Sequence, residues 1–229
     1  MLIQVAAIDK FPLIGIYGGT FDPIHYGHLR IAEELLDVIN LKRIIFVPSG
    51  APRLRAAPIA ARNHRSNMVH LAIRDNSMFS LDEREVNRPG ISTTIESLRE
   101  YQCELGDSAA LCFILGMDAF VKINQWHNWH ELFSLCHMII VARPGYTSPN
   151  DYQILPVDLK KEFISRRVLD ANDLGLQTSG FIYTAQTSLL EISASHIRSL
   201  INAGKSIRYL LPENVSDYIK SNCLYTGNI

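Results

Sequence analysis

Apolar and polar positions along the chain predict strands that alternate with helices. Short apolar runs typical of strands occur at 13–17, 43–48, 79–82, 110–116, 137–143 and 181–184. Segments with a helical pattern follow at 27–40, 63–76, 92–102, with Ser92 as the expected N-cap, 155–168 and 193–202. This alternation predicts an α/β fold, a doubly wound and mostly parallel Rossmann-like sheet with helices on both faces.

Length and composition favour a single folded unit. The chain has 229 residues, of which 47% are hydrophobic and 20% charged, as is typical of a globular protein. We expect residues 1–12 to be an N-terminal extension and residues 13–229 to form one domain. Whether that domain forms a homo-oligomer is left open by the sequence.

The net charge and the cysteine spacing indicate which binding partners and which cellular compartment to expect. The net charge is −1, so no overall basic field attracts nucleic acid, and we expect no nucleic-acid partner. The apolar run Val5–Ile8 is too short for a membrane span or a signal peptide, so we expect no membrane association. The four cysteines form no CxxC pair, and the cytoplasm is the expected compartment.

The segment between the first strand and the next helix carries the clearest candidate chemistry. Gly18 and Gly19 are expected to let the backbone turn tightly and approach a ligand closely. Backbone N–H groups at the helix start favour an anion. His25 and His28, three residues apart, would lie on one face of that helix and could both donate to one phosphate. These features together predict a phosphate-handling site.

Metal binding is the rival use of paired histidines. The neighbouring Asp22 alone does not complete a zinc ligand set, and no cysteine lies nearby. We therefore expect no metal site formed by the protein itself.

Further candidate residues follow other predicted strands. Asp118, after Gly116, could accept hydrogen bonds from a ribose or a ring, or could cap a helix. Trp126 could stack on a planar heterocycle, whereas core packing is the favoured interpretation for Trp129. Because ligands of open α/β sheets bind beyond the carboxyl ends of the strands, near the switch in strand order, we expect these segments to converge.

The predicted helix start at Ser193 is a second candidate phosphate site. The hydroxyls of Ser193 and Ser195 and the backbone N–H groups could bind phosphate oxygens, and Arg198 adds a fixed positive charge one turn on. An ordinary capped helix is the alternative interpretation.

Several of these segments resemble the motifs of a known superfamily. Residues 18–28 resemble the GGTFDPxHxGH signature of the nucleotidylyltransferases, whose HxGH element is related to the HIGH motif of class I aminoacyl-tRNA synthetases. Residues 116–118 resemble the GxD element, 192–198 the ISSTxIR element and 143–146 the RPGY turn. Within the superfamily the chain is most similar to the bacterial nicotinate-nucleotide adenylyltransferase family, from about Leu13 to Tyr225.

The resemblance implies that AMP is transferred from ATP to nicotinate mononucleotide, giving deamido-NAD and pyrophosphate, with Mg²⁺ bound through the ATP phosphates. It implies catalytic roles for His28, His25 and Arg198. The ATP-binding residues it implies are Gly18, Gly19, Thr20, Phe21, His25, His28, Ile192, Ser193, Ser195 and Arg198. The mononucleotide-binding residues it implies are Thr94, Gly116, Asp118, Trp126, His127 and Arg143.

The chain departs from the family pattern in two places. His127 stands where an aromatic residue is expected, although a backbone N–H there could still recognise the ring carboxylate. In the loop after the second strand, Leu54 replaces the histidine of a PPHK-like sequence, and Arg53 or Arg55 could supply the charge or be solvated. Arg143 could contact a phosphate or only tie down its loop.

Two alternative functions differ from this reaction, one in the acceptor substrate and one in the absence of catalysis. An adenylyl or cytidylyl transferase acting on another phosphate, such as phosphopantetheine, would share the nucleotide site. A nucleotide-binding module without catalysis is a second alternative. A tRNA ligase is set aside because the chain has no room for a tRNA-binding domain. The preference for nicotinate over nicotinamide mononucleotide is not set by any motif.

Overall fold

The computed structural model describes residues 10–50, 57–90, 92–142, 152–188 and 190–227. Its strands are β1 (Leu13–Gly19), β2 (Arg43–Pro48), β3 (Phe79–Leu81), β4 (Ala110–Gly116), β5 (His137–Val141), β6 (Arg167–Val168) and β7 (Ile182–Ala185). Its α-helices are α1 (Tyr26–Ile39), α2 (Arg62–Ile73), α3 (Arg84–Asn87), α4 (Thr94–Leu105), α5 (Met117–Phe120), α6 (Leu132–Leu135), α7 (Val157–Arg166), α8 (Ala194–Asn202) and α9 (Glu213–Ser221). Short 3₁₀ turns are η1 (Gly106–Ser108), η2 (Ile123–Gln125), η3 (Trp129–Glu131), η4 (Tyr152–Ile154) and η5 (Ala171–Leu176).

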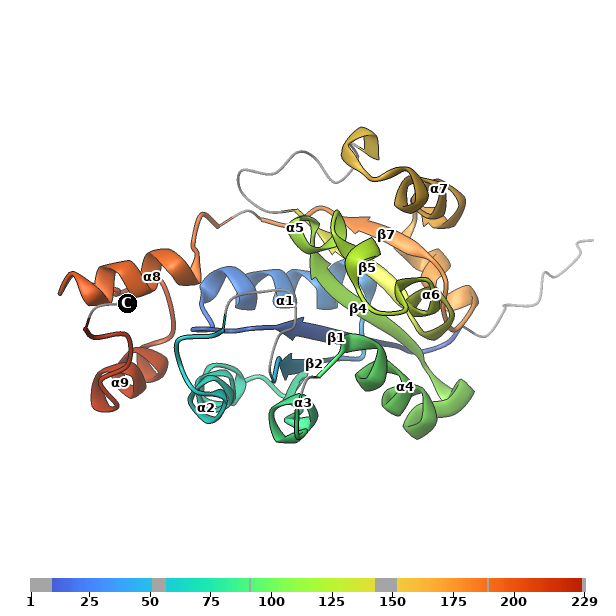
Figure 1. Ribbon diagram of the computed structural model, residues 1–229. Helices are drawn as coiled ribbons and strands as arrows, with labels where there is room; N and C mark the ends of the chain where they lie inside the picture. The colour runs from blue at the N-terminus through green and yellow to red at the C-terminus, as the bar shows by residue number, and fades with distance from the viewer. Residues whose placement is uncertain (1–9, 51–56, 91, 143–151, 189, 228–229) are drawn as a thin grey trace, which may run out of the picture.

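The strands form one seven-stranded sheet in the order β3-β2-β1-β4-β5-β7-β6, in which every described pair is parallel (Figure 1). The predicted doubly wound parallel fold is therefore confirmed. β2 and β3 extend the sheet on one side of β1, and the chain then crosses over to add β4 on the other side. The strand order therefore switches direction between β1 and β4. Ligands of such sheets bind beyond the carboxyl ends of the strands at this switch point.

Alternate residues of the central strands build a core on each face of the sheet. Tyr17 and Phe46 point to one face, where they belong to the same apolar cluster as buried residues of α1, α2, α8 and α9. Ile16 and Phe113 point to the other face, which α4, α5, α6 and α7 cover. Helices on both faces explain why the strands are apolar at consecutive positions.

Some predicted element boundaries are wrong. α4 begins at Thr94 and not at Ser92, because Thr93 is the N-cap. Both the N–H and the hydroxyl of Thr93 donate to the Glu96 carboxylate, at 3.1 and 2.8 Å. The Ser92 hydroxyl instead accepts a hydrogen bond from Arg88 at 2.6 Å. The helix expected over 155–168 ends at Arg166, and its last two residues form the edge strand β6.

Within the residues described, no helix is both long and apolar enough to cross a membrane.

Candidate active site

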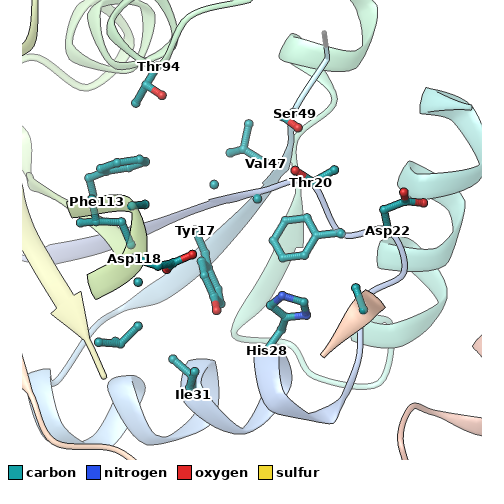
Figure 2. Close-up of a pocket in the computed structure, with 18 of the residues that line it drawn as sticks. Tyr17, Thr20, Asp22, His28, Ile31, Val47, Ser49, Thr94, Phe113 and Asp118 are labelled. Carbon is teal, nitrogen blue, oxygen red and sulfur yellow. The ribbon is translucent and has the colours of Figure 1, made fainter. Parts of the chain in front are cut away.

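A cavity of about 1200 Å³ lies at the switch point of the sheet (Figure 2). Figure 2 shows His28 of α1 and Thr94 of α4 at opposite ends of it, with Tyr17 of β1 between them. The segments that were expected to converge do so here. The predicted site residues that line it are Gly18, Gly19, Thr20, Phe21, His25, His28, Thr94, Gly116, Asp118, Trp126, His127, Ile192, Ser193, Ser195 and Arg198. Arg143, like Arg53, Leu54 and Arg55, lies outside the described residues.

The two histidines lie together at the N-terminus of α1, as predicted. Their rings stack with centroids 3.8 Å apart and an interplanar angle of 28°. His25 is the N-cap residue, and its backbone N–H donates to Nδ1 of His28 at 3.3 Å. A neutral imidazole that accepts at Nδ1 carries its proton on Nε2. His28 is thereby held as the Nε2–H tautomer, a hydrogen-bond donor.

Gly18 and Gly19 serve close packing, so their predicted role in a tight turn is wrong. Both lie in the extended strand β1, and the turn is made by Phe21, whose φ is +49°. A Cβ at Gly19 would lie 2.8 Å from the Phe21 ring, and one at Gly18 would lie 3.2 Å from the Phe113 ring. The Phe21 ring in turn meets the His28 ring edge-on at 5.1 Å. The glycines therefore let aromatic rings support the imidazole.

A second helix N-terminus faces the same cavity. Ser193 caps α8 by accepting a hydrogen bond from the His196 N–H at 3.2 Å, and it also lines the cavity. Arg198, one turn on, donates to the Ser195 hydroxyl at 3.2 Å and to the Asp22 carbonyl at 2.7 Å. Two helix N-termini, two imidazoles and a guanidinium thus surround one end of the cavity, an arrangement suited to polyphosphate.

Two buried side chains support this end: Arg65, which the sequence analysis did not identify, and Asp22, which it considered only as a metal ligand. Arg65 of α2 is 1% exposed and donates to the carbonyls of Thr20 and Gly50, at 2.8 and 3.1 Å. Burial lowers the pKa of Arg65. Asp22 is also buried, and the hydroxyl of the distant Tyr225 donates to its carboxylate at 2.7 Å. No local pattern identifies such contacts, because the partners are far apart in the sequence.

The other end of the cavity carries the residues expected to bind the mononucleotide. Gly116 is the N-cap of α5, so Asp118 lies in the first turn and the capping interpretation for it is wrong. The Trp126 ring packs edge-on against Phe113, with centroids 6.2 Å apart, and is half-buried. Among the described residues that line the cavity, Trp126 is present and Trp129 is not. Trp129 packs against the core, as predicted.

Glu85 lines the cavity and was also missed by the sequence analysis. The Ser97 hydroxyl of α4 donates to its carboxylate at 2.9 Å. Burial raises the pKa of Glu85. Arg88 donates to the hydroxyls of Ser92 and Ser97, at 2.6 and 3.2 Å. This network holds the start of α4, and therefore Thr94, at the cavity wall.

The donor set does not resemble a resident metal cage. Across the described ranges, no three His, Cys, Asp or Glu side chains cluster in a way that could hold a metal ion. The Asp22 carboxylate already accepts hydrogen bonds from the Ile59 and Ala60 N–H groups and from Tyr225.

Fold and site together define a nucleotide-binding α/β protein of the nucleotidyltransferase type. The model of the cytidylyltransferase-like family matches residues 16–200. A probable nicotinate-nucleotide adenylyltransferase of Dechloromonas aromatica (strain RCB) is 40% identical over 94% of this chain and 98% of its own length. One of Serratia proteamaculans (strain 568) is 41% identical over 95% and 97%. The chain belongs to the cytidylyltransferase-like family and, within it, to the nicotinate-nucleotide adenylyltransferases.

Solved structures share the fold. The nicotinic acid mononucleotide adenylyltransferase of Plasmodium falciparum complexed with NaAD aligns with a TM-score of 0.70 and 21% identity. The alignment covers 93% of this chain and 97% of that chain. A putative nicotinate-nucleotide adenylyltransferase from Vibrio parahaemolyticus aligns with a TM-score of 0.61 and 17% identity, over 95% and 97%.

Proposed function

We propose that this protein transfers AMP from ATP to nicotinate mononucleotide, giving deamido-NAD and pyrophosphate. The observation that carries the proposal is that one cavity holds a polyphosphate-binding end and an aromatic, hydroxyl-bearing end. The first is formed by the N-termini of α1 and α8, and the second by the starts of α4 and α5. Family membership and the names of the curated relatives agree with this reaction.

The reaction is a direct displacement at phosphorus. A phosphate oxygen of the mononucleotide attacks the α-phosphorus of ATP and forms the new P–O bond. The bond from the α-phosphorus to the oxygen that bridges to the β-phosphate breaks in line, and pyrophosphate leaves with the electron pair. No side chain needs to form a covalent bond, so the protein acts by positioning and by stabilising charge.

His28 and Arg198 stabilise the charge that develops. The Nε2–H of His28 donates to an α-phosphate oxygen, because the backbone N–H of His25 occupies Nδ1. Arg198 and the N-termini of α1 and α8 bind the β- and γ-phosphates, which become the leaving group. His25 supports the His28 ring by stacking on it.

Magnesium enters as part of the nucleotide substrate. Nucleotidyltransferases of this kind generally use a divalent metal ion. We assign it as Mg²⁺ that arrives bound to the ATP phosphates, where it would neutralise part of their charge. The absence of a carboxylate cluster among the described residues is compatible with a cation that arrives on ATP.

The opposite end of the cavity selects the acceptor. Trp126 stacks on the pyridine ring, and backbone N–H groups beside His127 bind the ring carboxylate. Thr94 and Asp118 hydrogen-bond the rest of the mononucleotide, while Gly116 lets it approach the strand end.

A turnover comparison tests the proposal. The purified protein is incubated with ATP and Mg²⁺ and with nicotinate mononucleotide, nicotinamide mononucleotide or phosphopantetheine, and pyrophosphate and the dinucleotide are quantified. We expect the highest kcat/KM with nicotinate mononucleotide. Equal values for the two mononucleotides would contradict nicotinate specificity, and a preference for phosphopantetheine would contradict the reaction. ATP binding without turnover of any acceptor would identify a non-catalytic module.

A further inference from the structure

The C-terminal segment reaches back to the phosphate-binding end of the cavity. Tyr225 follows α9, is 4% exposed and donates its hydroxyl to Oδ1 of Asp22 at 2.7 Å. The two residues are 203 positions apart in the sequence. The match to the family model ends at residue 200, so Tyr225 lies beyond it. Tyr225 belongs to the same apolar cluster as Ile197 of α8, the helix that carries Arg198.

Asp22 is the centre of a buried polar network that we name the Asp22 network: Asp22, Ile59, Ala60, Arg198 and Tyr225. Its Oδ2 accepts from the Ile59 N–H at 2.8 Å, and its Oδ1 accepts from the Ala60 N–H at 3.1 Å. Nη1 of Arg198 lies 3.9 Å from Oδ2 but donates to the backbone carbonyl of Asp22 at 2.7 Å. The carboxylate is therefore near the guanidinium without a direct hydrogen bond to it.

Tyr225 is a permanent donor in this network. Burial and the adjacent Asp22 carboxylate both raise the pKa of Tyr225, so the phenol stays protonated. Without its hydroxyl, the buried carboxylate would lose one of its three hydrogen-bond donors in the described structure and keep the Ile59 and Ala60 N–H groups and the ion pair with Arg198, a loss that is costly for a charged group. Two cations of the described chain lie near the carboxylate: Arg65, whose Nη1 and Nη2 groups donate to backbone carbonyls, and Arg198, which is already paired with it at 3.9 Å. Arg198 could move closer to replace the lost donor, and its attraction is strong because the pair is poorly solvated.

We propose that Tyr225 is a positioning residue for ATP binding. By holding the Asp22 carboxylate, it keeps the Arg198 guanidinium directed to the triphosphate and keeps the Asp22–Arg198 ion pair, now 3.9 Å apart, from closing into a direct hydrogen bond. This inference rests on the proposed function, which assigns Arg198 to the ATP phosphates.

Tyr218 offers a matched control. It lies on α9 in the same C-terminal segment, and its hydroxyl accepts a hydrogen bond from Asn67 at 3.0 Å and lies 2.9 Å from Nδ1 of His64. It does not belong to the residues described as lining the cavity. Tyr218→Phe therefore removes a hydroxyl between α9 and α2 without touching the Asp22 network.

ATP affinity is measured by isothermal titration of each protein with MgATP and no acceptor, and KM is then measured for both substrates. We expect Tyr225→Phe to raise the Kd and the KM for ATP by about 10- to 100-fold, the size of one charged hydrogen bond. We expect the KM for nicotinate mononucleotide to stay constant. Tyr218→Phe should leave the ATP affinity unchanged, and it should lower the melting temperature by about as much as Tyr225→Phe does.

A double variant tests the mechanism. With Asp22→Asn no carboxylate attracts Arg198, so adding Tyr225→Phe should change the ATP affinity by less than about twofold. Additive effects would overturn the proposal. So would a Tyr225→Phe variant that binds ATP normally, raises both KM values equally or does not fold, because Tyr225 would then serve stability alone.

The titration also separates this proposal from the proposed function. A wild-type protein that binds ATP but does not turn over nicotinate mononucleotide contradicts the reaction, whereas the effect of Tyr225→Phe on ATP affinity is still measured. A wild-type protein that does not bind ATP overturns both proposals.

Discussion

His28 carries the first prediction at the scale of single residues. Replacing it with alanine removes a preorganised donor to the α-phosphate, and such a loss typically lowers kcat by about 10²- to 10³-fold. Stability should change little, because the ring is only half-buried and lies on the cavity wall. Initial rates with saturating ATP and nicotinate mononucleotide, together with a thermal unfolding curve, measure both effects.

His130 is the control for that experiment, since its side chain is 65% exposed and lies outside the described cavity lining. His130→Ala should keep the activity of the wild type. Near-full activity of His28→Ala would show that His28 does not stabilise the transition state.

Gly27 gives a second prediction at this scale. A Cβ there would lie 3.0 Å from two atoms of the His25 ring and 3.5 Å from the Ile192 carbonyl. Because His25 is buried, Gly27→Ala should displace its ring from the stack on His28 and lower kcat/KM by about 10- to 100-fold. The free energy of unfolding should change by no more than about 1 kcal/mol, since alanine favours the helix.

The combination with His25→Ala checks the mechanism of that loss. If Gly27→Ala acts through the imidazole, the double variant should be no less active than His25→Ala alone. A further drop in the double variant would indicate that the Cβ obstructs the nucleotide or the segment around Ile192 instead.

Local motifs predicted many of the residues that line the cavity, but neither Glu85, which also lines it, nor the buried residues that support it. Glycine, histidine and serine at strand-to-helix junctions have recognisable local physics, which is why 18–28 and 192–198 could be assigned to phosphate. Arg65, Glu85 and Tyr225 act through partners far along the chain. Such contacts depend on tertiary packing, which spacing along a sequence does not encode.

At the scale of elements, Ser193 tests whether the start of α8 is only a helix cap. Ser193→Asp keeps an N-cap acceptor for the His196 N–H, so stability should be retained. The added negative charge faces the phosphates and should weaken ATP binding by at least about tenfold. Ser193→Ala should instead lower the free energy of unfolding by about 1 kcal/mol. ATP titration and chemical denaturation of both variants measure the two effects.

Normal ATP affinity of Ser193→Asp would assign the residue to capping alone. The two variants thus separate roles that the wild-type hydroxyl combines, since it can accept from the helix and donate to a ligand at once.

Long periodic elements were predicted well and short ones were not. The apolar runs of β1, β2 and β4 are buried on both faces, so their composition identifies them. β6 has two residues and α3 has four, and both are too short to show a repeating pattern of apolar positions. The start of α4 was misplaced because Ser92, Thr93 and Thr94 can all cap, and only the position of Glu96 distinguishes them.

At the scale of the whole molecule, strand order creates the site. The carboxyl ends of β1 and β4 are adjacent because β2 and β3 lie on one side of β1 and the later strands on the other. Alternation of strands and helices predicted a parallel sheet, and general topology predicted where its ligands bind. The edge position of β6, outside β7, could not be predicted because no rule of patterning sets the order of a short edge strand.

His137 links the stability of the whole sheet to pH. The imidazole begins β5 and is fully buried, with Nδ1 accepting from the Phe181 N–H and Nε2 donating to the Gln177 carbonyl, both at 3.0 Å. Burial lowers the pKa of His137 from 6.5 to about 4. The unfolded chain therefore takes up this proton first as the pH falls, and stability is lost between about pH 6.5 and pH 4.

The free energy of unfolding should thus fall by about 2 kcal/mol between pH 7.5 and pH 5 through this residue alone. His137→Gln keeps an amide that can donate to the Gln177 carbonyl but has no titrating group. Urea denaturation at the two pH values should show a smaller difference for His137→Gln than for the wild type, even though the variant is less stable at pH 7.5. Equal pH dependence in both proteins would mean that His137 is protonated in the folded state at pH 5. Carboxylates with lowered pKa values, such as Asp82 beside Arg84, lose their contribution only at more acidic pH. Groups such as Glu85, whose pKa is raised by burial, are present in both proteins, so the difference between the two proteins isolates the histidine.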